Sequence, residues 1–404
     1  MSKNYAGLTE DSTSSVLTET IKQDNKTLRQ MEKLYESNKS SDYTEKMEEL
    51  YKSFNYSDNS EHNWTYPYFS VLYGSPIYES ASESQKRALN HLYWVCFYNY
   101  VMGGEITTMV CNQICCGAFY PLGGYEVVCH ELDIETSQER VHVEAFRHIG
   151  RMTELSLFGK TIFERPMPDY VDGSVIKPQK RSRSLIDRLP VQFLFARMGT
   201  SPFLATQYFT ARGLRNIQAK VKEYQHSLYG RERSKRDEFV CAPTLVSHNH
   251  CFDEGFHTTT SKFISHELRK EFDKPNSLDI FLANEMIRGV QYSFNALSCA
   301  VPGIFSDDAQ YMPLVYEMLQ SPLFNLSTQE ALLLMEKSFC QEHEGFHVAA
   351  KYHHRAFTQN LEFVAGLDYL YPVNRELRVV ASTSIDEAIK NNISAFQRFS
   401  KSFN

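Results

Sequence analysis

The sequence predicts an all-α fold. Three long stretches, at 85–116, 128–146 and 191–228, repeat related residues at spacings of three and four, the period of an amphipathic helix. Ser82 and Gln85 have the spacing of a capping box, which marks the start of the first stretch. Because the alternation typical of β-strands is scarce along the chain, we expect the helices to pack on one another as a bundle.

The predicted helices are distributed over three segments. Residues 1–62 are polar and predict a partly helical N-terminal extension, whereas 63–270 predict the main helical core. Within that core, 159–190 hold several prolines and a basic run, which indicate an irregular insertion. Residues 271–404 predict further helices, at about 278–300 and 327–366, packed on the core within the same domain.

The composition limits the class of protein. Of 404 residues, 42% are hydrophobic and 23% are charged, as in a folded globular chain. The formal net charge of -7 argues against a general nucleic-acid binder. The N-terminus lacks the apolar stretch of a signal peptide, and no apolar run approaches the ~20 residues that cross a bilayer. We therefore expect a cytoplasmic protein without membrane contact, whose nine cysteines are reduced.

Glutamate and histidine recur as the motif Glu-x-x-His at 139–142, 254–257 and 344–347. On a helix, residues three apart project from the same side, so a carboxylate and an imidazole can bind one metal ion together. Helical bundles that hold two metal ions combine two such motifs with a single Glu from each of two further helices. A site of this kind therefore requires two additional glutamates on other helices.

A single Glu lies one helix upstream of each of the first two motifs. Glu105 precedes the first and Glu223 the second, and His250, four residues before Glu254, adds an imidazole on the same helix face. We predict a site for two metal ions in which Glu139 and Glu254 bridge the metals and act in catalysis. Imidazole and carboxylate ligands favour two iron ions, with manganese as the alternative. The predicted ligands are Glu105, Glu139, His142, Glu223, His250, Glu254 and His257.

The sequence leaves alternatives open for this set. The apolar stripe within 214–228 lies away from Glu223 on a simple helical wheel, which would point Glu223 toward solvent. Its competitor is Glu285, which would combine with Glu344 and His347 of the third motif. The first motif could also form an internal polar pair that binds no metal. We favour the set with Glu223.

These residues resemble the p-aminobenzoate N-oxygenase-like family of non-haem di-iron oxygenases. That family's pattern is Glu, Glu-x-x-His, Glu and then His-x-x-x-Glu-x-x-His, which the seven predicted ligands match in order. The stretch YGSPIYESASESQKRALNHLYW, just before and into the first long helix, also looks like the family's lead-in. The resemblance covers roughly 64–270.

The resemblance implies a ferritin-like helical core with a di-iron cofactor and O₂-dependent N-oxygenation of an amine in specialised metabolism. Its expected partners are the amine, O₂ and an external electron donor or reductase, with a homodimer left open. Another di-iron oxidation, such as C-hydroxylation, desaturation or oxidative cleavage, is the alternative within enzymes, and an iron-binding helical scaffold is the alternative outside them. We expect Trp94, Tyr98, Phe146 and Phe256 to line a largely apolar substrate pocket.

Overall fold

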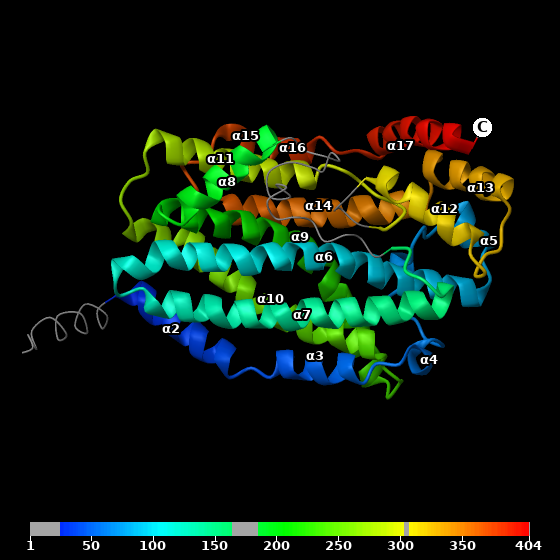
Figure 1. Cartoon of the computed structure of the whole chain (residues 1–404), viewed down its shortest axis with the longest axis horizontal. Helices are drawn as coiled ribbons and strands as arrows, with labels where there is room; N and C mark the ends of the chain where they lie inside the picture. Colours follow the sequence, from blue (N-terminus) through cyan, green and yellow to red (C-terminus); the bar gives the residue numbers. More distant parts are fainter. Residues whose placement is uncertain (1–24, 164–184, 303–306, 404) are drawn as a thin grey trace, which may run out of the picture.

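The computed structural model describes residues 25–163, 185–302 and 307–403. Among these residues the regular structure is helical, without a β-strand, which confirms the predicted all-α class. The longest helices lie side by side along the long axis of the molecule (Figure 1).

Four long helices form the centre of the bundle: α6 (Glu83–Phe119), α7 (Glu126–Phe158), α9 (Pro202–Lys235) and α10 (Ala242–His266). The first pair and the second pair each form a hairpin whose helices pack together along much of their length. α6 also packs on α9, and α7 on α10, so the two hairpins face each other.

The first hairpin is set by local chemistry at both ends of α6. The Ser82 side chain accepts a hydrogen bond from the backbone N–H of Gln85, whose side chain accepts one from the Ser82 backbone, so the predicted capping box is present. After α6, Gly123 and Gly124 adopt φ values of 66° and 84°, a left-handed region that glycine enters at little cost. These glycines turn the chain back into α7.

A polar layer crosses the middle of the four helices and separates two apolar cores. On α6, Trp94 and Tyr98 belong to one core and Cys111 and Cys115 to the other, with Glu105 between them. α7 and α10 share this pattern of apolar ends around a buried polar middle, whereas α9 contributes its first half to the second core and its buried polar residues follow. The two helices of a hairpin run antiparallel and pack along much of their length, so their midpoints lie side by side. Their polar middles therefore lie at the same level of the bundle.

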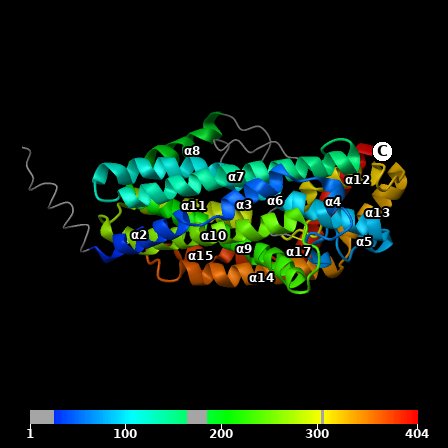
Figure 2. The same ribbon diagram turned by 90° about the horizontal axis from the view of Figure 1, so that it is seen from below.

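The N-terminal helices cover one side of this layer. α2 (Lys26–Lys39) and α3 (Tyr43–Lys52) pack on α7 and α10, and Figure 2 shows them running along these helices. Asn38 at the end of α2 is buried, and Thr44 at the start of α3 donates a hydrogen bond into the core. The N-terminal segment thus reaches the polar layer.

The helices after α10 differ in detail from the prediction. The helix expected over 327–366 is broken into α13 (Thr328–Cys340) and α14 (Glu344–Val364). Gln341 ends the first in an extended conformation, and the His343 side chain accepts the backbone N–H of Gly345 at the start of the second. α14 packs on α9, opposite the polar layer.

The insertion expected over 159–190 is interrupted by a helix, since α8 begins at Leu185; its basic run at 180–183 lies outside the described residues. The remaining α-helices are α4 (Tyr56–Asn59), α5 (Pro76–Ser80), α8 (Leu185–Met198), α11 (Ser277–Ser293), α12 (Met312–Gln320), α15 (Pro372–Arg375), α16 (Arg378–Ala381) and α17 (Ile385–Ser400). Short 3₁₀-helices are η1 (Pro67–Phe69), η2 (Tyr120–Leu122), η4 (Leu268–Glu271), η5 (Asp308–Gln310) and η6 (Lys401–Phe403).

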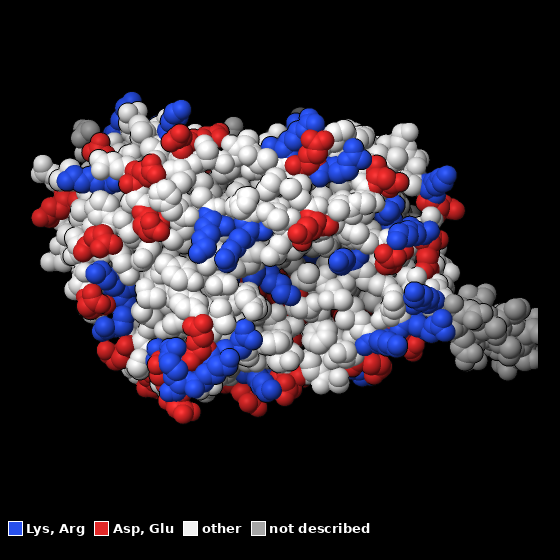
Figure 3. Space-filling model, turned by 180° about the vertical axis from the view of Figure 1, so that it is seen from behind, with Lys and Arg blue, Asp and Glu red and all other residues white. Residues whose placement is uncertain are grey.

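The surface carries both signs of charge. On the face seen in Figure 3, acidic and basic side chains are interspersed. Within the described parts of the chain, every helix is too short or too polar to pass through a bilayer.

Candidate metal centre

The four central helices bring all seven predicted ligands into the polar layer. α6 supplies Glu105, α7 supplies Glu139 and His142, α9 supplies Glu223, and α10 supplies His250, Glu254 and His257. Each of these side chains is buried, with at most 9% of its residue surface exposed. Packing, rather than sequence proximity, therefore assembles the group.

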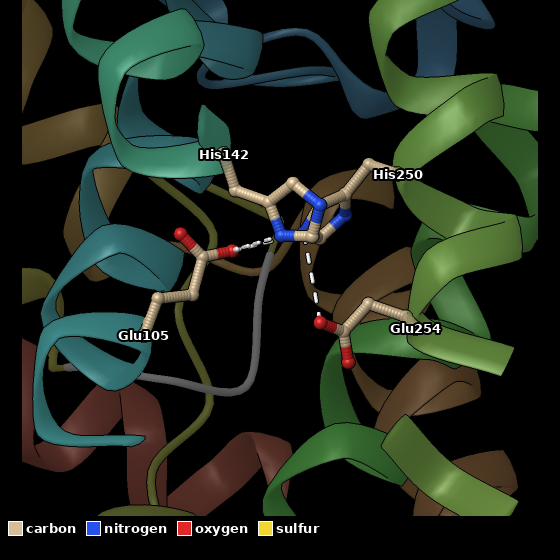
Figure 4. Close-up of side chains that lie close together, drawn as sticks. All are labelled: Glu105, His142, His250 and Glu254. Carbon is tan, nitrogen blue, oxygen red and sulfur yellow. Dashed lines mark hydrogen bonds and ion pairs between the residues drawn. The ribbon is translucent and has the colours of Figure 1, made fainter. Parts of the chain in front are cut away.

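One half of the centre is formed by Glu105, His142, His250 and Glu254, whose nearest ligand atoms all lie within 4.8 Å of one another. Figure 4 shows the four side chains pointing toward a common point from three helices. Nε2 of His250 lies 2.9 Å from Oε1 of Glu105 and 3.8 Å from Oε1 of Glu254. Nδ1 of His142 lies 3.9 Å from the same Glu105 oxygen.

The other half is formed by Glu139, Glu254 and His257, again within 4.8 Å. Nδ1 of His257 lies 2.8 Å from Oε1 of Glu254 and 3.4 Å from Oε1 of Glu139. The second oxygen of Glu139 faces Nδ1 of His142 at 3.4 Å. Glu139 thus presents one oxygen to each half, and Glu254 belongs to both, which are the positions that bridging carboxylates require.

The Nε2 atoms of two histidines are held from outside the centre. Nε2 of His142 lies 3.1 Å from Oδ2 of Asp253, which also accepts a hydrogen bond from Thr44. Nε2 of His257 lies 3.0 Å from Oε1 of Gln138, whose side-chain amide donates to Asn38. Such contacts fix the ring and turn the other nitrogen, Nδ1, inward as a metal ligand.

These outer partners were absent from the sequence prediction, although a signal for them exists. Gln138 immediately precedes the Glu of the first motif, and Asp253 immediately precedes the Glu of the second. Each holds the histidine of the opposite motif, so the two helices exchange supporting contacts. The crossing itself depends on how α7 and α10 face each other, which a single sequence does not display.

Glu223 is placed differently from a helical-wheel reading of α9. The wheel pointed it toward solvent, yet Glu223 is 1% exposed, whereas Tyr224 of the supposed apolar stripe is 50% exposed. The reason is that α9 is covered by α6, α10 and α14 at once. Oε1 of Glu223 accepts the Tyr98 hydroxyl at 2.7 Å and contacts Nδ1 of His250. Its role as a direct ligand stays a prediction.

Glu223 also begins a fourth Glu-x-x-His sequence, which the sequence prediction did not include. Its histidine is His226. His226 belongs to neither half of the centre, and its Nε2 lies 3.2 Å from the Tyr93 hydroxyl. Burial, together with the charge of Lys222, lowers the pKa of His226 to about 3, so this imidazole is neutral.

The competing ligands lie on the surface. Glu285 is half exposed and faces Arg288 at 3.7 Å on α11. Glu344 and His347 are exposed in the first turn of α14, and Nε2 of His347 lies 3.0 Å from Glu342. The third motif is therefore separated from the polar layer.

The chemistry of the centre fits metal ions. Four glutamates and Asp253 surround three histidines in a buried space, and such an excess of negative charge is costly unless cations compensate for it. Among the described residues, Oε2 of Glu105 and Oδ1 of Asp253 are buried without a hydrogen-bond partner. Burial raises the pKa of Glu105 to about 7, against an opposing hydrogen bond with His250. A bound cation would satisfy the Glu105 oxygen and favour the charged form of this carboxyl.

A buried ion pair next to the centre links the central helices. Arg212 of α9 forms two hydrogen bonds to Glu135 of α7, at 2.5 and 3.3 Å. The same guanidinium donates to Asn112 on α6 and to the backbone oxygen of His257 on α10. It therefore ties all four central helices together next to the ligands.

A pocket reaches the centre between α6 and α9. It contains about 750 Å³ of space between atoms, part of it open to solvent. The predicted lining residues were wrong, because Trp94, Tyr98, Phe146 and Phe256 are not among the residues that line it. The pocket is lined by Tyr100, Val101, Gly104, Glu105, Thr107, Thr108, Glu139, Tyr208, Ala211, Arg212, Arg215, Asn216, Ala219, Lys220, Glu223, His250, Glu254 and Phe294.

Comparison with known proteins corrects the family expected from the motif. The model of a family described as "Acyl halogenase CylC-like" matches residues 26–189 and 172–400, including the N- and C-terminal helices that the motif did not explain. This family is distinct from the p-aminobenzoate N-oxygenases, so that resemblance was wrong. No curated protein and no solved structure matches the chain significantly. The chain belongs to the CylC-like acyl halogenase family, which indicates an oxidative, halogenating enzyme.

Proposed function

We propose that this protein is an O₂-dependent halogenase that uses two iron ions to replace a C–H bond of an acyl group by a carbon–halogen bond. Two facing Glu-x-x-His motifs carry the proposal, because their glutamates, Glu139 and Glu254, each lie next to both halves of the centre. The chain that holds them belongs to the acyl halogenase family. Bound iron would supply the reduction of O₂ and the oxidising power for the C–H bond.

The chain's own residues would hold and shield this chemistry. Glu139 and Glu254 would bridge the metals, and Nδ1 of His142 and His257 would bind one metal each. His250 and Glu105 would complete the first half, and Glu223 would bind directly or orient His250. The two apolar cores on either side would leave the pocket as the route to this space.

The pocket supports an anionic reactant. Arg215 and Lys220 line it, and the carboxylates in its lining are all predicted metal ligands, whose negative charge bound metal would offset. The positive charge of Arg215 and Lys220 favours halide entry and offers a contact for a polar acyl head group. The reaction balances as R–H + X⁻ + O₂ + 2e⁻ + 3H⁺ → R–X + 2H₂O, so each turnover requires an external two-electron donor.

The test is anaerobic loading with Fe(II), followed by O₂, chloride or bromide, a chemical reductant and a panel of fatty acids and acyl thioesters. We expect about two irons per chain and a product with the isotope pattern of one halogen. Glu139→Ala and His257→Ala should lose iron and product. The matched control is His347→Ala, which removes the histidine of the surface motif and should retain both.

The outcomes separate the functions. A hydroxylated or desaturated product without halogen would favour the alternative oxidation at the same centre. A stably folded protein that takes up no iron would refute the metal site itself. Equal iron loss in His347→Ala and His257→Ala would show that the surface motif, too, binds metal.

A further inference from the structure

A row of aromatic rings leads from the centre to the surface. The ring of Tyr98 lies 5.8 Å from that of His250, and the ring of Trp94 lies 4.5 Å from that of Tyr98. Trp64 follows at 5.8 Å from Trp94, and Tyr56 at 6.1 Å from Trp64, all between ring centroids. Trp64, Trp94 and Tyr98 are fully buried, whereas Tyr56, on α4, is partly exposed.

Both tyrosines at the ends of the row have a partner for their proton. The Tyr98 hydroxyl donates to Oε1 of Glu223 at 2.7 Å. The Tyr56 hydroxyl lies 3.0 Å from Nδ1 of His91, whose Nε2 lies 2.8 Å from the backbone oxygen of His62. That carbonyl can only accept, so Nε2 of His91 carries the proton and Nδ1 accepts from Tyr56.

The tryptophans between them have neutral partners. Nε1 of Trp94 donates to Ser247 at 2.8 Å and to the Pro243 carbonyl at 3.1 Å. Nε1 of Trp64 donates to the Asn59 carbonyl at 2.9 Å. None of these acceptors is a base, so an oxidised indole would keep its proton and pass the charge onward.

The row and the pocket leave the centre by different routes. Along α6, the pocket is lined by residues from Tyr100 onward, whereas Trp94 and Tyr98 precede them. None of the four rings of the row lines the pocket. An electron moving along the row would therefore bypass a bound substrate.

We propose that Tyr56, Trp64, Trp94 and Tyr98 form an electron-transfer path between the metal centre and a one-electron donor at the surface. The inference rests on the redox-active centre of the proposed function. Tyr98 gives an electron to the oxidised centre and its proton to Glu223, and an electron from Trp94 then restores Tyr98 as the proton returns. Trp64 restores Trp94, Tyr56 restores Trp64 while its proton moves to His91, and the external donor restores Tyr56.

The chain offers a sharp spectroscopic test, because Trp64 and Trp94 are its only two tryptophans. Fe(II)-loaded full-length protein is mixed with O₂ without acyl substrate, frozen within milliseconds and examined by electron paramagnetic resonance. Ring-deuterated tryptophan identifies indole radicals through a narrowed signal. We expect indole and tyrosyl radicals in the wild type, and ascorbate should quench them.

Variants test the order of the row. In Trp94→Phe the indole signal should disappear although Trp64 remains, because the link between Trp64 and Tyr98 is broken. Trp94→Tyr should restore the indole signal of Trp64. Reduction of the oxidised protein by ascorbate should slow in Trp94→Phe by more than about tenfold, equivalent to ~1.4 kcal/mol in the barrier. The matched control is Tyr93→Phe, a buried neighbour on α6 whose ring contacts Phe69 and His226 instead; it should behave as wild type.

The path is refuted if an indole radical persists in Trp94→Phe, if no aromatic radical accompanies metal oxidation, or if the Tyr93 and Trp94 variants are reduced at equal rates. Should Trp94→Phe fail to fold, Tyr98→Phe removes the first carrier with a smaller change and should abolish both radicals. Halogenated product without aromatic radicals would overturn the path alone. Ordered radicals without halogenated product would overturn the halogenase proposal alone.

Discussion

Replacing Glu135 by Gln should destabilise the protein strongly, although Glu135 is not a predicted ligand. The substitution keeps the shape but leaves the guanidinium of Arg212, 3% exposed, without the one carboxylate that it contacts directly among the described residues. Breaking a buried ion pair on one side costs about 3–5 kcal/mol. We expect the lower end, because hydrogen bonds from Arg212 to Asn112, Ser261 and the His257 carbonyl remain. A loss of ~3 kcal/mol is a large share of the 5–15 kcal/mol typical of folded domains.

The assay is urea unfolding of the metal-free protein followed by circular dichroism. Because the slope grows with chain length and should reach ~3 kcal/mol per molar urea or more for 404 residues, the midpoint should fall by up to about 1 M. The control is Glu285→Gln, which breaks an Arg–Glu pair on the surface and should change the free energy of unfolding by less than ~0.5 kcal/mol. Equal midpoints for the two variants would refute the reasoning, as would a double variant with Arg212→Met that loses the full sum of both single costs.

Three other predictions concern the supports of the centre and the core. Asp253→Asn should weaken Co(II) or Fe(II) binding by about 10–100-fold, measured by titration, since it loosens the imidazole that Asp253 orients; unchanged affinity would contradict that role. Gly213→Ala should cost about 1–3 kcal/mol, because the new Cβ would lie 2.2 Å from Cζ of Phe363, whereas Gly117→Ala, with its nearest atom at 3.8 Å, should not clash; equal thermal midpoints would contradict this. Burial lowers the pKa of His91 to about 4, so its neutral form stabilises the fold above pH 6.5 and this contribution, up to ~3 kcal/mol, is lost as pH falls toward 4; His91→Gln should flatten the pH dependence of the urea midpoint, and an unchanged slope would count against it.

Local sequence was sufficient for the helical fold class and for the pairing of ligands within a helix. Glu139 with His142 and Glu254 with His257 share a helix face because three residues span most of one turn. The capping box at Ser82 likewise depends on residues three apart and is present as predicted. The family expected from the ligand order, in contrast, was wrong, and the match over residues 26–189 and 172–400 corrected it.

Only the tertiary structure decided which of these pairs meet and what lies around them. Glu223 is buried because several helices cover α9, among them α6, α10 and α14, whereas the wheel of one helix describes its own faces and not its neighbours. Glu344 and His347 have the same spacing as the ligands, yet the first turn of α14 leaves them in solvent. Asp253 holds the histidine of the opposite hairpin, a contact across 111 residues. The sequence by itself thus determined which side chains can act together on one helix, and packing determined which helices bring them to one point.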